Sequence, residues 1–438
     1  MASPSTFKGP AGPLRHRCPL CPLGPAGGTQ FLRCAGCQAF RYCSREHQVA
    51  HWPQHKSACP KIKKARAKLA REEEDVRNAT PDFMTPANAF ETSVGRFWGI
   101  VSTRDYMRAR FAVARQVLLL GTFDGVSEAL EHMRDMLRLC RSDNMGVGDQ
   151  VPAIMLRLDL DQECYDFVKW WVTCDPHGTH DWGDMSLPYL NIHGADFFED
   201  PGFLLGKFPA LNFTVAILLL KLKVLVDIRN LKVTRKVLAR GRLPFELWDQ
   251  IEREVIRSPL SAKLQKEPPA SLAKTEEKLM THIRQLGAAV VEANQDFVFY
   301  LFDPDEALST LPEAYSRGSW EEMALAMQYS YAAFWETQGV LDLLEDGRAC
   351  AARDSEDEIE EWMTDEKARQ GRTAAEEVLR DLGVNRIWGY LDYAVENASY
   401  LGDWSERPSE RRTRESREAW EQALAEESSE AWSGDDED

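Results

Sequence analysis

The chain has 438 residues, of which 44% are hydrophobic and 13 are tryptophan. This composition excludes an intrinsically disordered protein and allows two or three domains, at least one of them with a sizeable core. The formal net charge is −17, but it is unevenly distributed. Residues 1–71 contain 13 Lys or Arg and a single acid, Glu46, so the N-terminal part is basic and the remainder is strongly acidic.

The N-terminal residues contain no apolar segment of useful length for a secretory signal. The best membrane candidate, residues 208–226, is interrupted by Lys221 and Lys223, so we expect a buried core helix there. We therefore expect an intracellular protein, cytoplasmic or nuclear, with no membrane association. Six of the ten cysteines lie before residue 60. In a reducing compartment this crowding favours metal-bound thiolates over disulfides.

The first predicted element is a zinc-binding module at residues 18–59, after a disordered N-terminus at 1–17. Two C-x2-C pairs separated by 12 residues have zinc-ligand spacing, because each two-residue loop turns both sulfurs toward one ion. Four further Cys and His residues complete a set of eight, which serves two tetrahedral zinc ions and leaves no open coordination position. This is the structural pattern, not the catalytic one. The predicted ligands are Cys18, Cys21, Cys34, Cys37, Cys43, His47, His55 and Cys59.

Three histidines and one cysteine recur at every fourth residue from 47 to 59, a spacing that would place them on one face of a continuous helix. Pro53 lacks an N–H and clashes with the preceding helical turn, so we expect it to separate the two ligand pairs. His51 is then a partly exposed helix position and not a ligand. A metallopeptidase helix requires H-E-x-x-H, and Gln48 stands where the glutamate base belongs.

The spacing alone leaves the ligand pairing open, because the two C-x2-C pairs could also bind one zinc ion together. The order C-x2-C, C-x2-C, YC, ligand, Gln, Trp, HK, Cys in residues 18–59 resembles the MYND-type zinc finger. That resemblance implies a cross-braced module, in which one zinc ion is held by Cys18, Cys21, Cys43 and His47 and the other by Cys34, Cys37, His55 and Cys59. His47 departs from the family, which more often has cysteine there, but histidine also ligates zinc.

MYND fingers that resemble this one bind short peptides of partner proteins, and these peptides often contain proline. The residues that match the peptide-binding positions of the motif are Gln48 and Trp52. The resemblance therefore implies protein partners that are recognised through these two side chains. Tryptophan is a favoured interface anchor, because it buries a large area. A second interpretation stays open, in which Trp52 only caps the small core of the finger.

Residues 60–87 predict a charged helix, basic and then acidic, followed by a proline-containing linker. No aromatic residues alternate with its Lys and Arg, so nucleic acid is not expected as a partner.

From residue 88 to 402, amphipathic patterns predict a mostly α scaffold domain. The pairs 103–121 with 126–140 and 151–158 with 161–172 look like tetratricopeptide-type helical hairpins. Further helices are expected at 213–241, 244–257, 273–299, 319–345, 356–383 and 385–400. The predicted fold is a small cross-braced two-zinc finger followed by a mostly α, helical-hairpin domain, with a charged and disordered tail at 403–438.

A second cluster, Cys174, His177, His180 and Asp184, has a spacing that suits a metal, but with one cysteine it is better explained as a polar loop. The sequence contains no P-loop and no G-x-S-x-G elbow. It also contains no stretch like the cofactor-binding motif of SET-type lysine methyltransferases. We therefore expect a non-enzymatic, zinc-binding adaptor. The alternatives are a divergent lysine methyltransferase-related protein and a transcriptional regulator with weak DNA contact through the basic N-terminal region.

Overall fold

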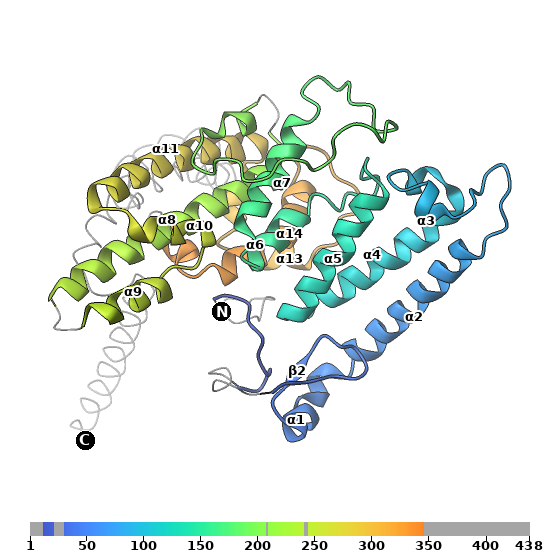
Figure 1. Ribbon diagram of the computed structural model, residues 1–438, viewed down its shortest axis with the longest axis horizontal. Coiled ribbons are helices and arrows are strands. Elements are labelled where there is room, and N and C mark those ends of the chain that lie inside the picture. Colours follow the sequence, from blue (N-terminus) through green and yellow to red (C-terminus); the bar gives the residue numbers. More distant parts are fainter. Residues whose placement is uncertain (1–11, 22–29, 207–208, 241–243, 346–438) are drawn as a thin grey trace, which may run out of the picture. The chain divides into compact units, whose positions relative to one another are not determined.

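The computed structural model describes residues 12–21, 30–206, 209–240 and 244–345. Within these ranges helices dominate, and strand pairing is limited to the antiparallel pair β1 (Leu32–Arg33) and β2 (Arg41–Tyr42) and one isolated bridge. A mostly helical body thus follows the finger, as predicted (Figure 1). The helices predicted at 356–383 and 385–400 and the tail at 403–438 lie outside the described residues.

Contacts within the chain define two compact units, residues 1–220 with 292–337 and residues 221–291 with 338–438. The first unit contains the finger and most of the short helices. Its helices are α1 (Arg45–His55), α2 (Ala58–Arg77), α3 (Ala89–Thr92), α4 (Arg104–Leu118), α5 (Phe123–Leu139), α6 (Val151–Arg157), α7 (Asp161–Thr173), α12 (Asp296–Tyr300), α13 (Asp305–Ser309) and α14 (Trp320–Glu336), with 3-10 turns at Phe97–Gly99, Val101–Thr103 and Pro201–Leu204.

Helices α4 and α5 form the part of the first unit that supports the finger. After α4 ends at Leu118, the chain turns through Gly121 with φ +60°, and Thr122 caps α5 by accepting a hydrogen bond from Gly125 N at 3.1 Å. A Cβ on Gly125 would lie 2.4 Å from the Val117 carbonyl oxygen, so the tight turn between the helices needs a glycine. The apolar residues that recur along α5 at helical spacing are buried: Ala129, Leu130, Met133, Met136 and Leu137.

Several helices of the first unit pack against their neighbours in the sequence. Helix α2 packs against α4, and α4 packs against α5 (Figure 1). Helix α6 contacts α5, α7 and α14. Arg157 of α6 forms a bidentate ion pair with Glu336 of α14, at 2.8 and 2.9 Å, and both side chains are buried. The pair joins two elements that are 179 residues apart in the sequence.

The second unit holds the greater parts of α8 (Leu211–Arg240) and α11 (Pro269–Ala293), together with α9 (Phe245–Glu254), α10 (Pro259–Ala262) and a 3-10 turn at Leu264–Lys266. Asp227 of α8 accepts hydrogen bonds from the backbone N–H groups of Arg257 and Ser258 at 3.0 and 2.8 Å, just before α10. The predicted core helix at 208–226 corresponds to the first half of α8, whose residues are largely buried, Lys221 and Lys223 included. No described helix is both long and apolar enough to cross a membrane.

Two predicted helices are shorter than their patterns indicated. The helix predicted at 273–299 ends at Ala293, because Asn294 turns its amide to the Ser319 carbonyl at 2.8 Å and accepts from Asp296 N at 3.1 Å. The helix predicted at 319–345 ends at Glu336, and the chain turns through Gly339 with φ +91° before it becomes helical again. The side-chain hydrogen bonds of Asn294 end the first helix, and the positive φ of Gly339 accompanies the end of the second. Hydrophobic periodicity contains no signal for either feature.

Candidate metal centre

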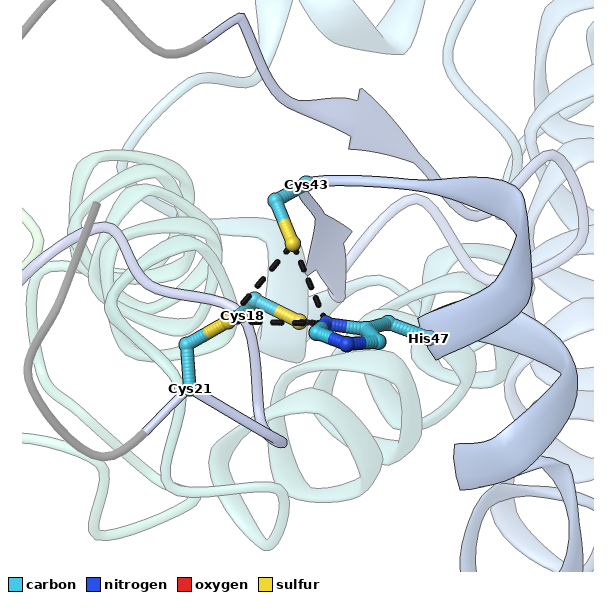
Figure 2. A group of neighbouring side chains, drawn as sticks. All are labelled: Cys18, Cys21, Cys43 and His47. Atoms are coloured by element: carbon cyan, nitrogen blue, oxygen red, sulfur yellow. Dashed lines mark hydrogen bonds between the residues drawn. The ribbon is translucent and has the colours of Figure 1, made fainter. Parts of the chain in front are cut away.

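The structure brings four of the predicted ligands together where the N-terminal segment meets β2 and α1. Cys18 and Cys21 come from one short loop, Cys43 follows β2, and His47 lies in the first turn of α1 (Figure 2). The Nδ1 atom of His47 lies 3.5 Å from the sulfurs of Cys18 and Cys21 and 3.1 Å from that of Cys43. The sulfurs of Cys21 and Cys43 are 3.5 Å apart.

The other four predicted ligands form a second group, and all of them are buried. Cys34 and Cys37 flank a tight loop between β1 and β2, His55 ends α1, and Cys59 lies in the first turn of α2. The Nε2 atom of His55 is 3.3 Å from the Cys34 sulfur and 3.5 Å from the Cys37 sulfur. The sulfurs of Cys34 and Cys59 are 3.8 Å apart. The grouping is the cross-braced one that the family resemblance implied.

Both groups have the dimensions of a tetrahedral zinc site. With Zn–S near 2.3 Å and Zn–N near 2.0 Å, two ligand sulfurs lie about 3.8 Å apart and a sulfur and a nitrogen about 3.5 Å apart. The separations found here run from 3.1 to 3.8 Å. In each group all ligand atoms lie within 4.8 Å of one another. Three thiolates and one imidazole complete each coordination shell with protein atoms alone, so the two zinc ions have structural roles.

The electrostatics of the buried group also suit a cation. Burial and, to a smaller extent, the neighbouring Cys34 and Cys59 raise the pKa of the Cys37 thiol to about 12, so its thiolate needs a positive partner. A zinc ion supplies that charge and holds the thiol deprotonated. Burial lowers the pKa of His55, with a smaller contribution from His51. The imidazole is therefore neutral, which is the form that ligates metals.

Local backbone structure explains why these residues meet. Cys21 N donates to the Cys18 carbonyl at 3.1 Å, which closes the first C-x2-C loop. In the second loop, a Cβ on Gly36 would lie 2.6 Å from the Cys59 sulfur, so only glycine lets the backbone approach the metal site. Ser44 caps α1 by accepting from His47 N at 3.3 Å, which places His47 in the first turn.

The prediction that Pro53 separates the two ligand pairs is wrong. Helix α1 continues through Pro53 to His55, and the chain breaks only at residues 56–57, before α2. Pro53 removes one hydrogen bond to the preceding turn. The helix tolerates this loss two residues before its end, where Lys56 N still donates to the Trp52 carbonyl at 2.8 Å. The ring of His55 also packs on Phe40, with 4.7 Å between ring centroids.

His51 is not one of the ligands, but it is buried and not partly exposed as predicted. Its Nδ1 atom lies 3.0 Å from the hydroxyl of Tyr42, which is itself fully buried. Its ring also meets Phe40 edge to face, with the centroids 5.0 Å apart. His51 therefore belongs to a small polar and aromatic core of the finger, beside the zinc ligand His55. The sequence pattern did not reveal this role, because Tyr42 and Phe40 approach it only in the folded finger.

The two residues assigned to peptide binding lie one helical turn apart on α1, outside the metal groups. The Trp52 side chain is 48% exposed, and its ring also packs edge to face on His55 with 5.8 Å between centroids. The half-buried Gln48 accepts a hydrogen bond from Arg45 through its amide oxygen. Val49, between them in the sequence, is 61% exposed. Trp52 thus covers a ligand with one part of its ring and presents another part to solvent.

The finger also contacts the first turn of α5 through a carboxylate that the sequence analysis did not single out. Asp124 accepts two hydrogen bonds from Arg41, at 2.6 and 2.8 Å, and one from Arg33 at 3.0 Å. The Thr122 hydroxyl donates to the Ala39 carbonyl at 2.8 Å. Burial disfavours ionisation of Asp124, but the hydrogen bonds and charge of Arg41 outweigh it and lower the pKa of this carboxyl. The carboxylate is therefore charged at neutral pH.

A second connection runs through α2. Arg66 donates to both carboxylate oxygens of Glu128 on α5, at 2.6 and 2.7 Å, and to the carbonyl oxygen of the zinc-site residue Cys37. Three arginines of the basic N-terminal region are thus neutralised within the chain. These contacts join residues 62 and 83 positions apart, and no local sequence signal identifies them.

The loop with Cys174, His177, His180 and Asp184 is not assembled as a metal site in the structure. Cys174 donates to the Trp171 carbonyl, Asp175 accepts from the backbone of Thr179 and His180, and the His180 ring lies 4.4 Å from that of Trp182. Among the described residues, the two finger groups are the ones whose ligand atoms converge. The polar-loop interpretation agrees with this arrangement.

Comparison with known proteins supports the assignment of a zinc-binding finger, and it concerns only this part of the chain. A family model described as the MYND finger matches residues 16–59, about a tenth of the chain. No solved structure matches the chain. The matched range contains both groups of four ligands and ends at the last of them, Cys59. Residues 16–59 are therefore a zinc-binding MYND finger, and a helical body follows it.

Proposed function

We propose that this protein is a non-enzymatic adaptor that binds peptides of partner proteins through its MYND finger. MYND fingers commonly bind protein partners. The observation that carries the proposal is the exposed part of Trp52 on α1, held against the zinc ligand His55. A rigid aromatic side chain that is already ordered loses little entropy when a partner covers it.

The exposed surface around Trp52 suits a short peptide that contains proline. Val49 and Trp52 offer apolar area, and Gln48 offers an amide for backbone hydrogen bonds. An extended proline-containing peptide packs its rings on aromatic side chains and has little conformational freedom to lose. The helical body then serves as the scaffold that carries the finger. Its resemblance to tetratricopeptide hairpins remains a prediction.

Three observations favour this function over its alternatives. Each zinc ion has four protein ligands, so neither has a position for a reacting water. A SET-type methyltransferase needs a β-sheet, and in the described part of the body the regular secondary structure is helical apart from one isolated bridge. Arg33, Arg41 and Arg66 of the basic region already pair with Asp124 and Glu128, which reduces the charge available to DNA. The thiolate ligands suit a reducing compartment, so we propose an intracellular location.

The test is an array of proline-containing peptides probed with zinc-loaded, full-length protein, followed by affinity measurements on the selected peptides. Trp52→Ala should weaken binding by about 2 kcal/mol or more, roughly 30-fold, as removal of a central aromatic anchor does. Leu119→Ala, which truncates another exposed apolar side chain of the body, should leave the affinity unchanged. Zinc content is measured in parallel for each variant.

The outcomes separate the two interpretations of Trp52. Weaker binding with both zinc ions retained supports the peptide-binding function. Loss of zinc from Trp52→Ala would show that the ring mainly stabilises the finger through His55. If the wild-type finger selects no peptide, or if Trp52→Ala binds as tightly as the wild type, the proposed function is wrong.

A further inference from the structure

The sequence contains four Ser or Thr residues that directly precede proline: Ser3, Thr80, Thr85 and Ser258. Proline-directed protein kinases select this dipeptide and bind it as an accessible, non-helical segment. The sequence alone gives the four positions equal standing. Ser3 lies outside the described residues, and the structure distinguishes the other three.

Ser258 is not accessible to a kinase in the folded protein. Its side chain is 2% exposed, and its hydroxyl oxygen accepts a hydrogen bond from Leu260 N at 3.2 Å, where it caps α10. Its backbone N–H donates to the Asp227 carboxylate at 2.8 Å. Phosphorylation here requires local unfolding of the second unit, and only a small fraction of molecules is open at any time.

Thr80 and Thr85 lie instead in the connection between α2 and α3. Helix α2 ends at Arg77, and Thr80 is exposed in a non-helical segment, as expected for a residue before proline. The next residues form a tight turn, in which Asp82 accepts hydrogen bonds from Met84 N at 2.8 Å and Thr85 N at 2.7 Å. Asp82 N donates to the Thr85 carbonyl at 3.0 Å. Thr85 is thus half-buried and tied to the turn, whereas Thr80 lies before it.

We propose that Thr80 is a phosphorylation site for a proline-directed Ser/Thr kinase, and that Thr85 and Ser258 are protected by the fold. In the reaction the Thr80 hydroxyl oxygen forms a bond to the γ-phosphorus of ATP. The bond between that phosphorus and the β,γ-bridging oxygen breaks, ADP leaves, and a base of the kinase takes the hydroxyl proton. The site is independent of the zinc finger's peptide-binding surface.

The structure also indicates what the phosphate does. Arg77, three residues before Thr80, donates to Glu73 at 2.7 and 3.0 Å, and its guanidinium lies 4.4 Å from the centroid of the Phe90 ring. A phosphate of charge near −2 on Thr80 competes with Glu73 for Arg77. It also sits just beyond the C-terminus of α2, where the helix dipole disfavours negative charge. Phosphorylation therefore loosens the last turn of α2 and its contact with Phe90 before α3.

The experiment treats zinc-loaded, full-length protein with a mitogen-activated protein kinase and Mg²⁺-ATP, and it follows each site by mass spectrometry over time. Two free peptides, residues 74–90 and 252–264, are treated in parallel to measure the intrinsic reactivity of the sites. In the folded protein, Thr80 should be modified at least about tenfold faster than Thr85 or Ser258 after correction for the peptide rates. Pro81→Ala should abolish modification of Thr80, and Thr80→Ala should not redirect it to Ser258.

Hydrogen exchange of the phosphorylated protein should be faster at residues 74–78 and unchanged in α5. The proposal is overturned if Thr80 stays unmodified in the protein while the free peptide reacts, or if the peptide itself is not a substrate. It is also overturned if Ser258 or Thr85 reacts as fast as Thr80 in the folded chain. Thr80→Ser, which keeps the hydroxyl, should retain the modification and serves as the matched positive control.

Discussion

Replacement of Asp124 by alanine should weaken zinc binding, although Asp124 is not a zinc ligand. Asp124 on α5 accepts three hydrogen bonds from arginines of the finger, and its side chain is 14% exposed. Arg41 lies in β2, and Arg33 lies in β1, directly before the ligand Cys34. Only a folded finger presents them together, and the finger folds only around its zinc ions. Docking on α5 and zinc binding are therefore linked equilibria.

The magnitude follows from the burial of the partners. Arg41 is 21% exposed and bonds Asp124 in a bidentate manner, and hydrogen bonds to charged groups contribute about 1.5–3 kcal/mol each. Arg33 is 50% exposed, so solvent screening reduces its contribution to below about 1 kcal/mol. Because these contacts are not additive, we expect Asp124→Ala to cost about 2–3 kcal/mol of docking free energy. Through the linkage, the apparent Kd for zinc rises about 30- to 140-fold.

The assay is competition for zinc between the full-length protein and a chromogenic chelator at neutral pH. The folded-state pKa of Asp124 is lowered, so its contribution is complete above the ordinary aspartate value of about 3.9 and is lost only as the pH falls below it. A neutral-pH measurement therefore captures the full effect. Asp124→Asn, which keeps the size but removes the charge, should also weaken zinc binding.

Two controls isolate the contact. Glu163→Ala removes an ion pair with Arg134 on the exposed surface of the same helical body, and it should change zinc affinity by less than about twofold. In the Arg41→Ala background, Asp124→Ala should cost much less than in the wild type, because the partner is already absent. If Asp124→Ala is folded and binds zinc as tightly as the wild type, the finger and the body are not energetically coupled and the reasoning fails.

Metal analysis should find two zinc ions per chain in the wild type, and Cys37→Ala should lose at least one of them and unfold the finger, since folding and metal binding are one process in so small a module. His51→Ala should keep both zinc ions but lower the stability of the finger by about 1–3 kcal/mol, because the buried Tyr42 hydroxyl loses its partner. Loss of a zinc ion from this variant would instead show that His51 is a ligand. Glu336→Ala should reduce the free energy of unfolding in urea by about 3–5 kcal/mol, because Arg157 is left buried without this carboxylate, and a cost below about 1 kcal/mol would contradict the buried ion pair.

The metal centre was predictable because its ligands occur at short, characteristic spacings in the sequence. Each C-x2-C loop brings two ligand sulfurs together through local backbone geometry, and Cys43 meets His47 across the N-terminus of α1, which Ser44 caps. The apolar periodicity of α4 and α5 likewise identified helices whose predicted faces are buried. Both signals concern residues a few positions apart, where the chain has few conformational choices.

Tertiary structure decided the features that depend on distant residues. The chain has 53 Lys or Arg and 70 Asp or Glu, so no local signal selects Asp124 as the partner of Arg41, 83 residues away. His51 is buried because Tyr42 and Phe40 pack on it, and the ring of His55 in the last turn of α1, beyond Pro53, also packs on Phe40. Thr80 and Ser258 precede proline equally in the sequence, but only the fold buries one and exposes the other. Local spacing thus determined which atoms bind metal, whereas packing between distant segments determined which surfaces remain accessible, because burial depends on neighbours that only the folded chain supplies.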